Sequence, residues 1–131
     1  MIKEKSCGAV VYKKEEEKIY FLIEEMKAGH YSIPKGHVEN NETEIETALR
    51  EIKEETNLDS NDFEIICIQD DINEYAHFVT IGLLCNSYSN EIKLSNTEEH
   101  IKFNFFNINQ LPDNLCEKKK KIIKSYLSKI E

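Results

Sequence analysis

The segment Thr43–Asn57 constrains the fold more than any other part of the chain, because it encodes both ends of one helix. Thr43 and Glu46 have the spacing of a capping box, which marks a helix start. Asn57 stands where a left-handed residue ends a helix, a place that glycine usually takes and asparagine tolerates. Between these ends, four apolar residues recur at i, i+3, i+4 and i+7 and predict a stripe that faces the core: Ile45, Ala48, Leu49 and Ile52.

Runs of apolar and β-branched residues on both sides of this helix predict strands. The runs cover residues 6–13, 19–26, 63–69, 77–88 and 103–107, with a short extended piece at 31–34. The first two are predicted to form a hairpin. Residues 118–130 predict a final helix with a solvated lysine face. Strands before and after one helix, with another helix last, predict an α/β fold in which helices cover both faces of a mixed sheet. The 131 residues suit a single domain over 1–131.

The charge of the chain limits its partners. It has 25 acidic and 17 basic side chains, a formal net charge of −8. A phosphate backbone or an anionic membrane would be repelled, so the prediction is no nucleic-acid and no membrane partner. No apolar run reaches the roughly 18–20 residues that a membrane span needs, and the charged N-terminus does not read as a signal peptide. Four cysteines without a CxxC pair predict neither zinc nor disulfides, and favour a reducing cytoplasm.

The acidic excess is concentrated around the predicted helix. Residues 39–55 hold seven carboxylates against Arg50 and Lys53, a local charge of −5. Glu51, Glu54 and Glu55 have i, i+3, i+4 spacing, which places three carboxylates on one helical face. Mutual repulsion there would be relieved by a hard divalent cation such as Mg²⁺, which prefers oxygen ligands and bridges to phosphates. The alternative is an ordinary solvated acidic face.

The residues around this cluster have a specific spacing. Gly36 is followed after five residues by Glu42, and after seven more by Arg50-Glu51-Ile52-x-Glu54-Glu55-x-Asn57-Leu58. This pattern resembles the Nudix box, with asparagine at position 57 where the box has glycine. The resemblance implies the Nudix fold, an α/β/α sandwich with a mixed sheet. It also implies a Mg²⁺-dependent hydrolase, with Mn²⁺ as a possible substitute, that cleaves a nucleoside diphosphate linked to another group.

The resemblance assigns roles to individual residues. Glu51, Glu54 and Glu55 match the family's metal-binding and base-supplying glutamates, and the backbone carbonyl near Gly36 matches a further metal ligand. We expect Glu54 to be the catalytic base, with Glu51 as the alternative. Arg50, the only arginine in the chain, matches a residue that pairs with Glu42 or Glu51 and holds the loop on the helix. A guanidinium can bind a carboxylate through two parallel hydrogen bonds, and lysine cannot.

The similarity extends beyond the box, over about residues 6–106. The run from Pro34 to Glu39, PKGHVE, looks like the loop of diadenosine tetraphosphate hydrolases within the family. On this reading Lys35 and His37 contact substrate, Glu99 is a distal metal ligand with Glu98 as its competitor, and Phe103 stacks on a base. Such stacking is worth ~1–3 kcal/mol. The alternative for Phe103 is an ordinary core position. The chain lacks the tryptophans that this branch often has.

Three functions are compatible with these features, and each implies a small nucleotide ligand and a monomer or homodimer. The first is asymmetric cleavage of a dinucleoside polyphosphate such as diadenosine tetraphosphate, giving ATP and AMP. The second is a MutT-type pyrophosphohydrolase of nucleoside triphosphates, because residues 77–81, HFVTI, look more like those enzymes. The third is a non-catalytic Nudix-like nucleotide sensor, which would tolerate the loss of a carboxylate, whereas this chain keeps all three.

Overall fold

A computed structural model describes residues 2–39, 41–93 and 100–130 of the chain. The predicted strands and helices are all present, and most of the strands are longer than the sequence patterns suggested. In chain order the elements are β1 (Ile2–Glu15), β2 (Lys18–Met26), β3 (Tyr31–Ser32), β4 (Lys35–His37), α1 (Glu44–Thr56), β5 (Asp59–Ile72), β6 (Ala76–Ser89), β7 (His100–Asn107), a 3₁₀ turn (Ile108–Gln110) and α2 (Glu117–Ile130).

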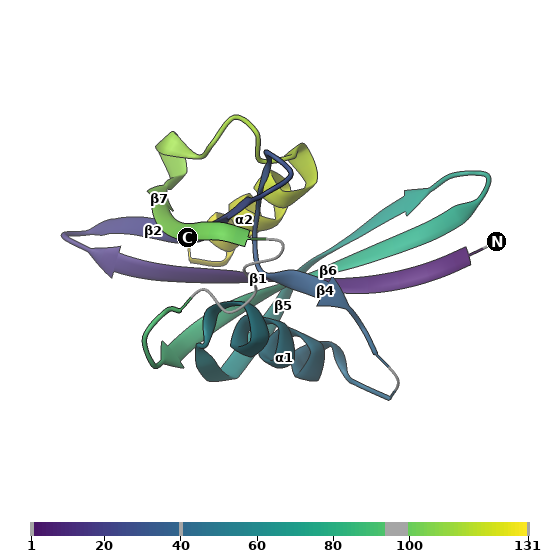
Figure 1. Cartoon of the computed structure of the whole chain (residues 1–131), viewed down its shortest axis with the longest axis horizontal. Helices are drawn as coiled ribbons and strands as arrows, with labels where there is room; N and C mark the ends of the chain where they lie inside the picture. Colours follow the sequence, from purple (N-terminus) through teal and green to yellow (C-terminus); the bar gives the residue numbers. More distant parts are fainter. Residues whose placement is uncertain (1, 40, 94–99, 131) are drawn as a thin grey trace.

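The strands form one mixed sheet, as predicted. Its main path runs β3-β2-β1-β6-β5, while β4 pairs with β1 and β7 pairs with β2. β1 and β6 are parallel over residues 2–11 and 76–85, and the other pairings are antiparallel, including the predicted β1–β2 hairpin. The long β1 joins both halves of the sheet. Figure 1 shows α1 on one side of these strands and α2 on the other, which confirms the helix–sheet–helix layering.

Successive side chains along each strand point to opposite faces of the sheet, and this divides the core into two layers. On β1, Cys7, Ala9 and Val11 belong to the cluster that includes Ala48 of α1, whereas Val10 belongs to the cluster on the α2 side. This follows from the period of two along a strand, which sends successive side chains to opposite faces. Among the described helices, none is both long enough and apolar enough to cross a membrane.

Both predicted ends of α1 are confirmed. The Thr43 side chain accepts from the Glu46 amide, and the Glu46 carboxylate accepts from the Thr43 amide, which completes the capping box. Asn57 is left-handed at φ 69°, and its side-chain amide donates to the Glu91 carbonyl at 3.1 Å. That bond to a distant loop gives a physical reason for asparagine where the box has glycine, since glycine could adopt the backbone angle but not make the contact.

The predicted core stripe of α1 is only half right. Ala48 and Ile52 are fully buried, but Ile45 and Leu49 are 45% and 38% exposed. The helix is rotated so that Thr47, Glu55 and Thr56 are buried instead. The threonine hydroxyls bond to helix carbonyls, Thr47 to Thr43 and Thr56 to Ile52, so their burial leaves no polar group unsatisfied. In this orientation Glu51 and Glu55 are turned towards β4, whereas Glu54 stays exposed to solvent.

The lysines of α2 also differ from the prediction of one solvated face. Lys118, Lys121 and Lys124 are exposed, but Lys119 and Lys120 are half-buried. Three apolar residues of the same helix, Ile122, Ile123 and Tyr126, are buried.

Candidate active site

A cavity of about 410 Å³ lies between β4 and α1. The β4 strand contributes the backbone of residues 35–37, and α1 contributes the acidic cluster. The structure therefore brings together most of the residues singled out from the sequence. The residues that line this cavity are Lys35, Gly36, His37, Glu39, Glu51, Glu54 and Glu55.

Arg50 fastens the loop to the helix. Its Nε and Nη2 atoms donate to the two carboxylate oxygens of Glu42 at 2.7 and 3.0 Å, so the parallel fork forms on Glu42, one of the two partners that the sequence analysis left open. Nη1 donates to Glu51 at 2.8 Å and to Glu54 at 3.4 Å, while Nη2 also reaches the His37 carbonyl at 3.0 Å. The hydrogen bond from Arg50 lowers the pKa of Glu42 to about 2. One guanidinium thus orients two of the three clustered carboxylates and the end of β4.

Gly36 and Glu51 fit closely together. A Cβ atom at position 36 would lie 2.0 Å from Glu51 Oε1 and 2.1 Å from its Cδ. The absence of a side chain at Gly36 therefore makes room for the Glu51 carboxylate against the backbone. The Glu51 side chain is 13% exposed. Burial raises the pKa of Glu51, and the neighbouring Arg50 opposes this shift.

Glu55 lies deepest in the cluster, beside a carboxyl that the sequence analysis missed. Glu55 is 9% exposed, and Glu24 on β2 is 1% exposed. Burial raises the pKa of Glu55 to about 10, with further contributions from Glu24 and Glu51, while the backbone amide of Lys35 opposes the shift. Glu24 sits within the apolar run of β2, where both faces are buried, so strand alternation gave no signal for it.

These donors suit a hard divalent cation. Buried carboxyls whose pKa values are raised by burial and by each other would be stabilised as carboxylates by a cation, and all the donors are oxygens. Within the described ranges, no three carboxylate, imidazole or thiolate groups already converge on one metal position. Arg50 instead draws Glu51 and Glu54 to itself.

The remaining predicted site residues have different positions. Lys35 and His37 line the cavity. Phe103 pairs with Glu24 between β7 and β2 and packs, partly buried, against the α1-side core; it is not among the residues that line the cavity. Glu99 and its competitor Glu98 lie outside the described residues.

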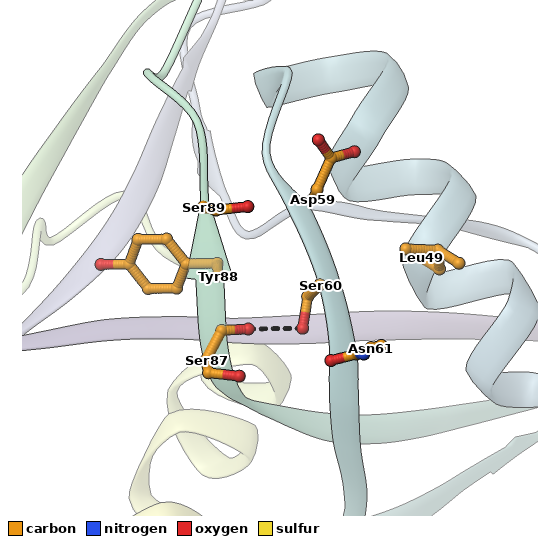
Figure 2. A pocket seen from close by; sticks show the side chains of 7 residues that line it. All are labelled: Leu49, Asp59, Ser60, Asn61, Ser87, Tyr88 and Ser89. Atoms are coloured by element: carbon orange, nitrogen blue, oxygen red, sulfur yellow. Dashed lines mark hydrogen bonds between the residues drawn. The ribbon is translucent and has the colours of Figure 1, made fainter.

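A second cavity, of about 390 Å³, lies on the other side of α1 beside the ends of β5 and β6 (Figure 2). Five of its seven lining side chains carry a hydroxyl or an amide group, and the Ser60 hydroxyl donates to the Ser87 carbonyl. The single carboxylate in this lining, Asp59, is paired with Lys53 at 3.1 Å. Its electrostatic character is therefore unlike that of the acidic cavity. The residues are Leu49, Asp59, Ser60, Asn61, Ser87, Tyr88 and Ser89.

Comparison with known proteins places this geometry in a family. The family described as NUDIX domain matches residues 3–126. The asymmetrical bis(5'-nucleosyl)-tetraphosphatase of Caenorhabditis elegans is 39% identical over 80 residues, 60% of this chain and 56% of that protein. The mouse protein of the same name is 34% identical over 70 residues, 47% of this chain and 48% of its own length. The chain therefore spans about half the length of these relatives.

Similarity of fold covers nearly the whole chain. The crystal structure of a MutT NUDIX hydrolase from Burkholderia pseudomallei superposes with a TM-score of 0.84 at 22% identity, covering 95% of this chain and 98% of that one. A family match over residues 3–126, the same fold and an acidic cavity formed by the Nudix-box residues agree with one another. The chain belongs to the Nudix family.

Proposed function

We propose that this protein hydrolyses a phosphoanhydride bond in a nucleoside diphosphate linked to another group, with a dinucleoside polyphosphate such as diadenosine tetraphosphate as substrate. The observation that carries the proposal is the cavity in which Glu51, Glu54 and Glu55 meet the backbone of Gly36. The relatives named as asymmetrical bis(5'-nucleosyl)-tetraphosphatases support the choice of substrate. Cleavage on one side of the tetraphosphate would give ATP and AMP.

Glu51, Glu55 and the Gly36 carbonyl are the groups that would hold Mg²⁺, or Mn²⁺ in its place, with Glu54 at the rim. When bound, such a cation supplies positive charge to the phosphate oxygens and makes water easier to deprotonate. This accounts for an acidic cavity in a protein whose ligand is an anion. The four cysteines are free, which suits a protein of the reducing cytoplasm. A monomer or a homodimer is compatible with the proposal.

Glu54 is the proposed catalytic base. Its side chain is 61% exposed, against 13% for Glu51, so its carboxylate can reach an attacking water. Glu51 is packed against Gly36 and bonded to Arg50, and Glu55 is buried. These contacts suit Glu51 and Glu55 to holding fixed positions. Arg50 orients Glu51 and Glu54, while Lys35 and His37, at the cavity wall, face the phosphates of the substrate.

Product analysis tests the proposal. The protein is incubated with diadenosine tetraphosphate and Mg²⁺, and the nucleotides are separated by ion-exchange chromatography. We expect ATP and AMP in equal amounts, and no reaction when the divalent cation is chelated. Release of pyrophosphate from nucleoside triphosphates, without action on dinucleoside polyphosphates, would indicate the MutT-type activity instead. Tight nucleotide binding without any Mg²⁺-dependent turnover would indicate a sensor.

A further inference from the structure

The last turn of α1 carries the proposed catalytic base, and few contacts hold that side chain. Glu54 lies two residues before Thr56, where the helix ends. Within the described parts of the chain, the single hydrogen bond or ion pair of the Glu54 carboxylate is the one with Arg50 Nη1, at 3.4 Å. The position of this carboxylate therefore depends mainly on how firmly the backbone of the last turn is held.

The end of α1 is held in part by backbone hydrogen bonds. The last carbonyls of a helix have no partner within the helix and need one from outside. The amide of Asn57 donates to the Lys53 carbonyl at 3.0 Å, a bond that a glycine at position 57 would also make. The carbonyl of Thr56 accepts from the amide of Lys93 at 2.9 Å. The chain just beyond β6 thus lies against the end of α1.

The side chain of Asn57 adds a second bond to this part of the chain. Its Nδ2 atom donates to the Glu91 carbonyl at 3.1 Å. The two bonds run in opposite directions, from the helix to Glu91 and from Lys93 to the helix. Between them, Ile92 is half-buried and packs against the core cluster that includes Ile52 of α1. The segment is therefore attached to the end of the helix at three points.

We propose that Asn57 is a positioning residue for the hydrolytic reaction, because its bond to Glu91 holds the last turn of α1, and with it Glu54, in one place. The inference rests on the proposed function. Ending the helix would be served equally well by the glycine of the Nudix box, which cannot make this bond. A misplacement of about 1 Å can cost a catalytic group about 10²-fold in rate, so a contact that orders the turn affects the chemical step.

This role differs from a contribution to stability alone. Glu54 acts when the attacking water is deprotonated, whereas Lys35 and His37 at the cavity wall belong to β4 and are not attached to the segment 91–93. Loosening the last turn should therefore lower kcat and leave KM nearly unchanged. A purely structural role would leave both constants unchanged at temperatures where the protein stays folded.

The first test measures the order of the last turn without any substrate. Backbone ¹⁵N relaxation and amide hydrogen exchange are compared for the unaltered protein, Asn57→Gly and the control Asn90→Gly. Asn90 is also left-handed, at φ 77°, but its side-chain amide donates to Asp59. We expect Asn57→Gly to lower the order parameter of the Glu54 amide from about 0.85 towards 0.6. Exchange of the Lys93 amide should become at least about fivefold faster, the scale of one lost hydrogen bond. Unchanged values in Asn57→Gly, or equal changes in both variants, would overturn the proposal.

The second test measures kcat and KM for diadenosine tetraphosphate, well below the melting temperature of each variant. Asn57→Gly should lower kcat by about three- to tenfold, the range for losing one hydrogen bond, and leave KM within about twofold. Asn90→Gly should change neither constant by more than about twofold. An unchanged kcat in Asn57→Gly, or an equal loss in Asn90→Gly, would contradict the positioning role.

A double variant tests whether Asn57 acts through the attached segment. Ile92→Ala removes the apolar attachment, and Asn57→Gly added to it should then lower kcat little further, because both changes release the same segment. Losses in kcat that multiply would show that Asn57 acts independently of the segment, against the proposal. If the unaltered protein turns over no substrate, the proposed function fails, while the relaxation and exchange measurements still decide whether Asn57 orders the last turn.

Discussion

At the scale of single residues, the three glutamates of the cavity differ in environment although they come from one short motif. Glu54 is exposed, Glu51 is held by Arg50 beside Gly36, and Glu55 is buried against Glu24. All three lie within five consecutive positions of the sequence, so contacts with other elements are what distinguish them. This difference is the basis for assigning Glu54 as the base.

Replacing Glu54 by Gln tests that assignment. The amide keeps the size of the side chain but cannot accept a proton, so we expect kcat to fall by roughly 10²–10⁴-fold with divalent cation saturating. Glu74→Gln, at an exposed position in the β5–β6 turn, is the matched control and should leave turnover unchanged. Nearly full turnover by Glu54→Gln would rule out Glu54 as the base, and a large loss in Glu51→Gln alone would transfer that role to Glu51.

Replacing Gly36 by Ala tests the close fit with Glu51. The added Cβ would meet the carboxylate at 2.0 Å, so Glu51 must move. We expect a loss of roughly 1–3 kcal/mol in the free energy of unfolding, as for other overpacked sites, and about 100-fold lower activity from the misplaced carboxylate. Urea denaturation and turnover assays measure the two effects.

The double variant Gly36→Ala/Glu51→Ala separates the loss of stability from the loss of activity. Removing the carboxylate removes the collision, so stability should recover relative to Gly36→Ala alone while activity stays low. A double variant that is no more stable than Gly36→Ala would show that Glu51 is not the source of the strain.

At the scale of elements, α1 is held to the preceding loop by Arg50 and Glu42. The Glu42 carboxylate accepts from two Arg50 nitrogens, from the Glu39 amide at 2.9 Å and from the Thr47 hydroxyl at 3.1 Å. These bonds hold the loop on the helix in the geometry that the Nudix-box spacing predicted. They also set the distance between the β4 backbone and the acidic face of α1.

The low pKa of Glu42 gives this contact a definite pH dependence. Its folded-state pKa, about 2, is below the ordinary value of 4.5, so the carboxylate stabilises the folded protein above about pH 4.5. That contribution is lost as the pH falls towards 2. Glu42→Gln lacks it at every pH. We therefore expect the stability difference between the two proteins, from urea denaturation, to be constant from pH 7 to 5 and to shrink by roughly half by pH 3. A difference as large at pH 3 as at pH 7 would contradict the pairing.

The orientation of α1 shows that the spacing of apolar residues does not by itself predict which face of a helix is buried. The spacing of Ile45 and Leu49 predicts burial as strongly as that of Ala48 and Ile52, but the first two are exposed. A helix can present either of two adjacent faces to a sheet, and the choice depends on what the sheet offers. Here β4 offers a backbone amide and a glycine that accommodate Glu55 and Glu51.

At the scale of the whole molecule, α2 completes the second core layer through Ile122, Ile123 and Tyr126. Ile123 is fully buried, and Tyr126 packs against Tyr12 and Phe21 with ring centroids 4.6 and 5.7 Å away. The helix is therefore an integral part of the folded domain.

Replacing Ile123 by Ala tests that integration. The free energy of unfolding should fall by roughly 2–5 kcal/mol, because a buried side chain is lost and a cavity remains. Lys124→Ala, exposed on the next position of the helix, should change it by less than about 0.5 kcal/mol. Circular dichroism and tyrosine fluorescence, followed through urea denaturation, should give one coincident transition. Separate transitions would mean that α2 unfolds independently of the sheet.

The sequence by itself determined the features that depend on neighbours along the chain. The ends of α1 and the β1–β2 hairpin follow from short-range spacing, and the family resemblance limited the partner of Arg50 to Glu42 or Glu51; the structure shows the fork on Glu42. The tertiary structure alone decided which face of α1 is buried and that Glu24 lies beside Glu55. Those contacts join residues far apart in sequence, and the packing of the two helices on one sheet, rather than any local preference, sets them.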